Sequence, residues 1–338
     1  MKRHGRWFIC LLVGLAAGCA QVRPLGPVNP DQLAVRARLT LVNAMDDPSP
    51  LIRAHAIEAL GEAGQSSSVQ YVLMGLSDKY WGVRFAACMA VLRMRYEPAK
   101  GLLVEKTRDP NRSVQAAAAG ALHVLGDQQY TSILGDTLFD KDPVVRRNTA
   151  MVLGRMGEPA ANKLLKRARL RDKDLSVKLQ VLEAMTVLGD RRSQRLMLNY
   201  CRSGYDDEIA LAVLALGQAN CQEAREQIVY VFEDSSRSGR LGMRLLSARA
   251  LAMLGDERGR EDARGALGYR RSTSATVSAQ QIRHLAALAL AAMPDPDDLP
   301  YLGPLLDDPD PDVRIAGALA ILKSAGKTAA AASPAPRI

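Results

Sequence analysis

The segment DPNRSVQAAAAGALHVLGD, residues 109–127, indicates the fold because it recurs in altered form along the chain. Two further copies are DPSPLIRAHAIEALGEAG at residues 47–64 and KDPVVRRNTAMVLGRMGE at residues 141–158. Each copy has a turn with Asp and Pro, then a β-branched residue, then several small residues, and it ends at Gly. Repetition at a fixed period predicts a repeat architecture.

The usually β-branched position sets the period of the repeat. Its successive spacings are 31, 31, 31, 32, 32, 34, 39 and 31 residues, which chance does not produce. Nine repeats are therefore predicted, and the sixth to eighth are the irregular ones. The nine anchor positions are Ile52, Val83, Val114, Val145, Val177, Ile209, Met243, Ile282 and Val313.

The side chains that follow each anchor have the periodicity of an α-helix. The residue four positions on is usually small, the residue seven on is Ala in seven of nine repeats, and the residue eight on is usually large. These offsets share one stripe of a helix. Small side chains on that stripe allow neighbouring helices to approach closely.

Helix boundaries are also predicted. An Asp five residues before the anchor, followed in three repeats by Pro, indicates a helix with Asp as its N-cap and Pro at its first position. Glycines including Gly61, Gly64 and Gly126 are predicted to end the same helices. A second amphipathic helix fits each gap, for example at Val69–Leu76.

Each unit of two antiparallel helices resembles a HEAT repeat, in the short subgroup related to phycobilisome-lyase repeats. The resemblance covers Asp31 to about Lys323. It implies an all-α solenoid of about nine helix pairs without an internal boundary, because one unit cannot bury its apolar stripe alone. Such a stack is expected to be roughly 80–90 Å long. Residues 324–338, rich in Ala and Pro, are predicted to be disordered.

A cationic column follows the anchors, since seven of the nine next residues are Arg or Lys. In HEAT-like families this Arg pairs with the turn Asp as a ladder between repeats, and the resemblance implies the same role here. The alternative is a basic strip that binds an anionic polymer. The predicted ladder residues are Arg53, Arg84, Arg146, Lys178, Arg244, Arg283, Arg314, Asp47, Asp78, Asp109, Asp140, Asp172 and Asp308.

The N-terminus resembles an export signal. Three cations precede an apolar stretch that is too short to span a bilayer. The sequence LAAGC at residues 15–19 resembles the lipobox of bacterial lipoproteins, although Ala16 stands where that family usually has Leu. The resemblance implies a signal peptide at 1–18, a lipid on Cys19 and an extended Pro-rich spacer through residue 30. A plain secretory signal with an incidental Cys is the alternative.

Composition and charge agree with this organisation. The 338 residues are 48% hydrophobic and 24% charged, which is ordinary for a soluble protein. The net charge of +9 becomes +6 when Lys2, Arg3 and Arg6 leave with the signal. After processing, Cys88, Cys201 and Cys221 are expected to be free thiols; antiparallel helices would place the last two at opposite ends.

No residue pattern supports catalysis, a metal or a cofactor. Deoxyhypusine hydroxylase, a HEAT relative, holds a di-iron centre with His-Glu pairs, and this chain has no His-Glu dipeptide. Its mature His residues, His55, His123 and His284, stand in different repeats. An exported protein would meet neither the pigment of phycobilin lyases nor nucleic acid. An enzyme of the lyase or hydroxylase class remains a disfavoured alternative.

Two inserted turns in the irregular repeats, 233–242 and 268–278, are the candidate partner-binding surface. Insertions in solenoids often map to the binding face, whereas tolerated surface insertion is the alternative. The candidate residues for an acidic or polar partner are Arg237, Arg240, Tyr269, Arg270 and Arg271.

The predicted function follows from architecture and analogy. We expect a non-catalytic, membrane-anchored scaffold for protein–protein interactions in the bacterial cell envelope. Because Ala20 follows the lipidated Cys, the outer membrane facing the periplasm is the expected location. The alternative binding function is retention of an anionic envelope polymer, such as lipopolysaccharide or peptidoglycan, through basic patches.

Overall fold

The computed structural model describes residues 26, 28–270 and 278–332, with side chains described as far as residue 327. Within these ranges the chain forms eighteen α-helices and no β-strand, so the predicted all-α class is confirmed. The proposed signal peptide and Cys19 lie outside the described residues, as does Arg271 in the second inserted turn.

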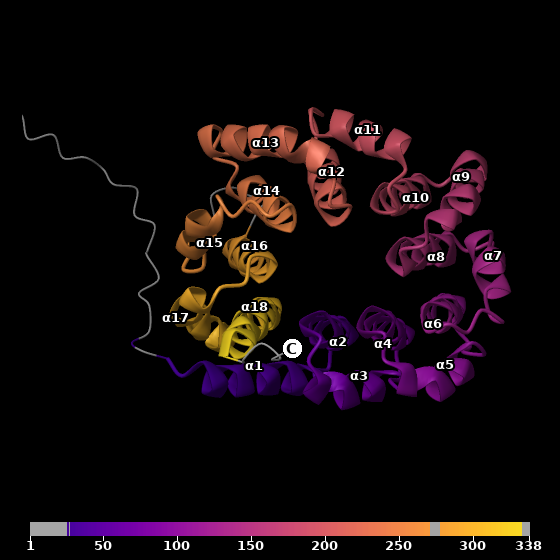
Figure 1. Ribbon diagram of the computed structural model, residues 1–338, viewed down its shortest axis with the longest axis horizontal. Helices are drawn as coiled ribbons and strands as arrows, with labels where there is room; N and C mark the ends of the chain where they lie inside the picture. The colour runs from indigo at the N-terminus through magenta and orange to yellow at the C-terminus, as the bar shows by residue number, and fades with distance from the viewer. Residues whose placement is uncertain (1–25, 27, 271–277, 333–338) are drawn as a thin grey trace, which may run out of the picture.

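The helices alternate between an outer and an inner layer of a ring (Figure 1). The outer helices are α1 (Pro30–Ala44), α3 (Val69–Gly75), α5 (Lys100–Lys106), α7 (Ser132–Leu138), α9 (Asn162–Arg171), α11 (Arg191–Tyr200), α13 (Arg225–Arg237), α15 (Arg260–Ala266) and α17 (Leu299–Leu302). The inner helices are α2 (Pro50–Ala63), α4 (Trp81–Met94), α6 (Arg112–Val124), α8 (Pro143–Met156), α10 (Leu175–Val187), α12 (Asp206–Gln218), α14 (Leu241–Met253), α16 (Ala279–Ala292) and α18 (Pro311–Ala332). Every repeat anchor falls in the first turn of an inner helix.

The inner helices pack on one another through the small residues of the repeat. Ala56, Ala87 and Ala118, each four residues after an anchor, are fully buried. Gly61 does not end α2 as predicted, because it lies inside the helix against α4. A Cβ at Gly61 would stand 2.5 Å from the Cβ of Ala90, so only glycine allows this approach.

The aspartate column lies outside the inner helices, so its predicted N-cap role is wrong. The N-cap of α6 is Asn111 and that of α8 is Asp142, two residues after the column. Oδ1 of Asp109 instead accepts a hydrogen bond from the backbone N–H of Asn111 at 2.9 Å, and Asp140 accepts from Asp142 in the same way. This local turn leaves one carboxylate oxygen without a local backbone donor.

The stack of repeats closes on itself, in contrast to the open solenoid expected from the sequence. The last helix, α18, packs against both α1 and α2 (Figure 1). We attribute the closure to the small inner side chains, which let inner helices approach closely and so rotate each repeat about the ring axis. Two ion pairs cross the seam, Arg36 Nη2–Asp307 Oδ1 at 2.5 Å and Lys323 Nζ–Glu62 Oε1 at 3.0 Å, together with a hydrogen bond between His55 Nδ1 and Asp312 Oδ1 at 2.7 Å.

The folded region extends further towards the C-terminus than predicted. Helix α18 continues past the expected boundary at residue 323 and ends at Ala332. Ser324 is fully buried, and its Oγ accepts a hydrogen bond from the backbone N–H of Asp295 at 3.2 Å. Residues 324–332 therefore extend the seam helix, which is buried as far as Ala325.

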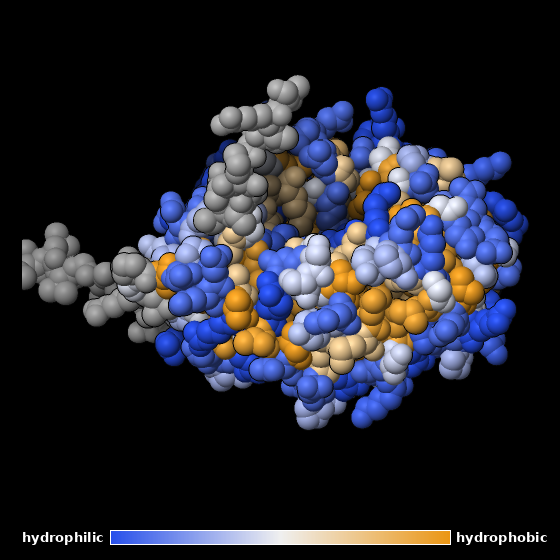
Figure 2. Space-filling view, turned by 60° about the horizontal axis from the view of Figure 1, so that its bottom comes forward, coloured by the Kyte–Doolittle hydropathy of each residue, from blue (hydrophilic) through white to orange (hydrophobic). Residues whose placement is uncertain are grey.

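Apolar side chains are exposed on successive outer helices. Val35 and Leu39 lie on the solvent side of α1, opposite buried Leu33, while Met74 follows on α3 and Leu102 on α5. Figure 2 brings this side of the ring forward and shows apolar side chains there among hydrophilic ones. Among the described residues, none of the helices has the length and apolar character needed to cross a membrane.

Candidate functional site

The arginines that follow the anchors join consecutive repeats. Arg146 on α8 donates from Nε and Nη2 to the carboxylate of Asp172 in the next repeat, at 2.6 and 2.9 Å. Its Nη1 donates to the carbonyls of Asp140 and Lys141 in its own turn, at 2.9 and 3.1 Å. One guanidinium thus holds two turns together through a bidentate, charge-assisted contact.

The other predicted ladder residues vary with the repeat. Arg53, Arg84 and Arg283 make the same bidentate contact to the next turn, with Asp78, Asp109 and Asp308 respectively. Arg314 donates only to the backbone carbonyls of Asp308 and Pro309. Asp47 takes part only through its backbone carbonyl, which accepts a hydrogen bond from Arg53. Asp140 pairs with Arg112 because the third repeat has Gln115 in the column. Arg244 pairs with Asp262 instead of a turn Asp, and Lys178 makes no ion pair with a described residue.

The arginines predicted to bind a partner are only partly available. Arg240 donates to Asp206 and Asp234, at 2.6 Å each, so its charge is already paired. Arg237 lies on α13, because residues 233–237 of the first inserted turn belong to that helix, and it contacts Glu233 at 3.6 Å. Tyr269 packs against the core, whereas Arg270 is exposed.

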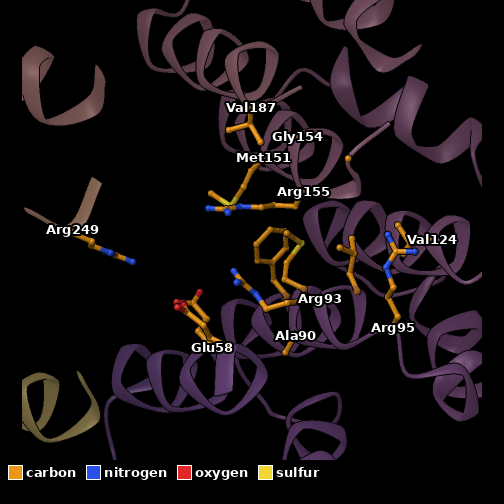
Figure 3. A pocket seen from close by; sticks show the side chains of 15 residues that line it. Glu58, Ala90, Arg93, Arg95, Val124, Met151, Gly154, Arg155, Val187 and Arg249 are labelled. Carbon is orange, nitrogen blue, oxygen red and sulfur yellow. The ribbon is translucent and has the colours of Figure 1, made fainter. Parts of the chain in front are cut away.

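The ring encloses a cavity of about 620 Å³ that sequence reasoning did not identify. Figure 3 shows Arg93, Arg155 and Arg249 directed into one space, with Glu58 at its edge. These side chains come from α4, α8, α14 and α2, so the site exists only because the solenoid curves. We call this space the lumen site. Its lining residues are Glu58, Glu62, Phe85, Met89, Ala90, Leu92, Arg93, Arg95, Val124, Met151, Gly154, Arg155, Gly157, Val187 and Arg249.

The surrounding protein perturbs the charged groups of the lumen site. Burial lowers the pKa of Arg155 and Arg249, and the positive charge of Arg93 lowers both further. Burial also raises the pKa of Glu58, although neighbouring cations oppose it. Glu62 differs: burial tends to raise its pKa, but the contact with Lys323 leaves that pKa lowered. Glu58, Arg93 and Arg155 nonetheless remain exposed to solvent inside the ring.

The lumen residues occupy two regular positions of the repeat, but these positions do not carry the same type of residue in every repeat. Positions six and ten residues after the anchor face the ring centre. They hold Glu58, Glu183 and Arg249 at the first offset, and Glu62, Arg93, Arg155 and Lys323 at the second, whereas the other repeats have apolar or small residues there. Because the charged residues recur irregularly at these positions, the site can be recognised only when the helices are placed in three dimensions.

The three described cysteines, Cys88, Cys201 and Cys221, are free and buried, as predicted. Burial raises the pKa of the Cys88 and Cys201 thiols to about 12, which keeps them protonated near neutral pH. Among the described residues, no group of three or more His, Cys, Asp or Glu side chains could hold a metal ion.

A known repeat family matches part of the chain. The family model of HEAT repeats matches residues 38–105 and 101–186, so this part of the chain consists of HEAT repeats. The chain as a whole has an all-α solenoid-like fold that carries them. No curated protein matches the chain.

Two solved structures are similar to this chain at a low level. The complex of CpcE and CpcF of phycocyanin lyase from Nostoc is 18% identical with a TM-score of 0.41, over 78% of this chain and 95% of that one. Human deoxyhypusine hydroxylase in complex with glycerol is 20% identical with a TM-score of 0.38, over 76% and 96%. Similarity at this level says nothing of what this chain binds or catalyses.

Proposed function

We propose that the protein is a non-catalytic, lipid-anchored scaffold that binds protein partners in the bacterial cell envelope. A diacylglyceryl group on Cys19 would tether the ring through the Pro-rich spacer that ends at α1. HEAT-type solenoids present extended surfaces to partners, and the closed ring would hold such a surface in a fixed shape.

The observation that carries this proposal is the exposed apolar strip on α1, α3 and α5, formed by Val35, Leu39, Met74 and Leu102. Met74 is 65% exposed, and the strip begins on α1, the first helix after the proposed tether, and continues on α3 and α5. Contiguous exposed apolar surface on a soluble domain is typical of a protein contact. An anionic polymer is less favoured, because Arg240 in the inserted turns is already paired with carboxylates.

Site-specific crosslinking tests the protein contact. A photoreactive amino acid at Met74 is expected to capture one or a few defined envelope proteins in living cells. The matched control is the same amino acid at Leu170 on α9, which is 87% exposed but lies outside the strip. Equal products from both positions, or none from Met74, would contradict the proposal.

Lipid attachment has its own test. Cells given labelled palmitate should incorporate label into the wild-type chain and none into a Cys19→Ser variant, and only the wild type should sediment with membranes. Label in the variant would exclude Cys19 as the acylated residue.

A further inference from the structure

The lumen site carries guanidinium groups that have no protein partner. Arg93, Arg155 and Arg249 make neither an ion pair nor a side-chain hydrogen bond with any described residue. Nε of Arg249 is buried without a hydrogen-bond partner. Buried polar groups are normally hydrogen-bonded, so this Nε lacks the expected partner, whereas Arg93 and Arg155 are exposed to solvent inside the ring. Arginine offers a planar fork that suits oxyanions. Three unpartnered forks in one space indicate room for an anion.

The carboxylates of the lumen do not neutralise these arginines at contact distance. Glu62 is paired with Lys323 at 3.0 Å, and Glu183 accepts a hydrogen bond from Gln180 at 2.9 Å. Glu58 forms no ion pair with a described residue, although its charge lies near the arginines. Burial is the main cause of the lowered pKa of Arg155 and Arg249; repulsion between the lumen arginines adds to it, and the charge of Glu62 opposes it.

Apolar side chains form the rest of the wall. Phe85 and Met89 on α4, Met151 on α8 and Val187 on α10 border the same cavity. A volume of about 620 Å³ is that of a small-molecule site. Flexible methionines beside an aromatic ring suit an apolar ligand body of irregular shape.

We propose that the lumen site binds a small organic anion, in which a phosphate or carboxylate group is attached to an apolar body. Arg93, Arg155 and Arg249 hold the oxyanion from opposite sides of the ring, and the apolar body lies against Met89 and Met151. This inference is independent of the proposed outer docking strip, because the two surfaces lie on different layers of the ring.

Calorimetric titration of the full chain in non-ionic detergent tests the site. The probes are butyl phosphate, butanoate, inorganic phosphate and butylammonium. At least one of the two anionic butyl compounds is expected to bind more tightly than inorganic phosphate, and butylammonium is expected not to bind. The tighter of the two anions identifies the headgroup.

Variants assign the binding to the named arginines. Arg155→Met and Arg249→Met should each weaken the tighter anion about tenfold, which corresponds to about 1.4 kcal/mol for a charged hydrogen bond. Arg155→Lys should give a partial loss, because it keeps the charge without the fork. Arg237→Met is the control: this exposed arginine lies on α13 away from the cavity, and its removal should leave affinity unchanged.

Several outcomes would overturn the assignment. These are the absence of binding by both butyl anions, equal binding of butylammonium, or an equal loss of affinity in Arg237→Met. Far-ultraviolet circular dichroism and melting curves of each variant separate loss of the site from loss of the fold. Because the probes are small molecules, a failure here leaves the crosslinking result at the outer strip unaffected.

Discussion

Helix α8 carries two arginines with opposite environments. Arg146, at its start, holds the carboxylate of Asp172 bidentately and two carbonyls of its own turn. Arg155, nine residues later, faces the lumen and has no partner among the described residues. Helix α4 carries the same two kinds of arginine: Arg84 belongs to the ladder, and Arg93 faces the lumen. The role of an arginine in this protein therefore depends on its position along an inner helix. An arginine at the start of the helix belongs to the ladder, and one nine residues later faces the lumen.

The largest effect should come from breaking the ladder. Arg146→Met leaves Asp172, whose side chain is only 4% exposed, without its cation. Removing one partner of a buried ion pair costs about 3 kcal/mol. We therefore expect a loss of that size in the free energy of unfolding, measured by urea denaturation with an unchanged slope. A loss below about 1 kcal/mol would place the ladder among ordinary surface pairs.

The ladder should also make the fold sensitive to acid. Hydrogen bonds from Arg53 and Arg146 lower the pKa of Asp78 and Asp172. A carboxyl with a lowered folded-state pKa contributes stability that is full above its unfolded pKa and is lost as pH falls through its folded pKa. Unfolding free energy measured from about pH 5 downward should fall accordingly. Arg53→Met should flatten this dependence; an unchanged slope would contradict the assignment.

An intermediate case is Lys323, a cation that has a partner but stays partly accessible. Its contact with Glu62 crosses the ring seam, and both side chains are 27% exposed. Lys323→Met should cost about 0.5–1 kcal/mol and should raise the pKa of Glu62, because burial is then opposed only by the charges of Arg93 and Arg249. Carbon NMR titration of the Glu62 carboxyl measures the change. An unaltered pKa would show that Lys323 does not hold this carboxylate in solution.

The smallest stability change is expected in the lumen. Arg155→Met removes a cation that has no partner and that Arg93 repels, so the free energy of unfolding should stay within about 0.5 kcal/mol of the wild type. Thermal and urea denaturation beside Arg146→Met make the comparison on one helix. A loss as large as that of the ladder variant would mean that Arg155 serves the fold.

Sequence periodicity predicted the secondary structure because every unit repeats one local pattern. The anchors, the buried Ala56 and Ala118 that follow them, and the helix ends at Gly64 and Gly126 could all be derived from spacing. The helix starts were misplaced by two residues because Asp109 can form either a cap or a preceding turn, and only the main-chain geometry separates the two.

The candidate site could not be derived in the same way. Arg93 and Arg249 are far apart in sequence and meet only across the ring, so no local spacing relates them. The inserted turns were predicted to bind a partner because the repeat length and the charge change there, yet Arg240 is paired with Asp206 and Asp234. Isolated charges on an inner helix look like ordinary surface residues until curvature gives them a common space.

The helix pairs, their number and the small-residue contacts between neighbours follow from the amino-acid sequence alone, because those features depend on side chains close together in the repeat. The tertiary structure decided that the ends meet, that the alanine-rich C-terminal segment forms the seam helix, and that arginines from distant repeats share one cavity. These outcomes depend on small rotations between repeats, which add up over nine units and which no single repeat encodes visibly.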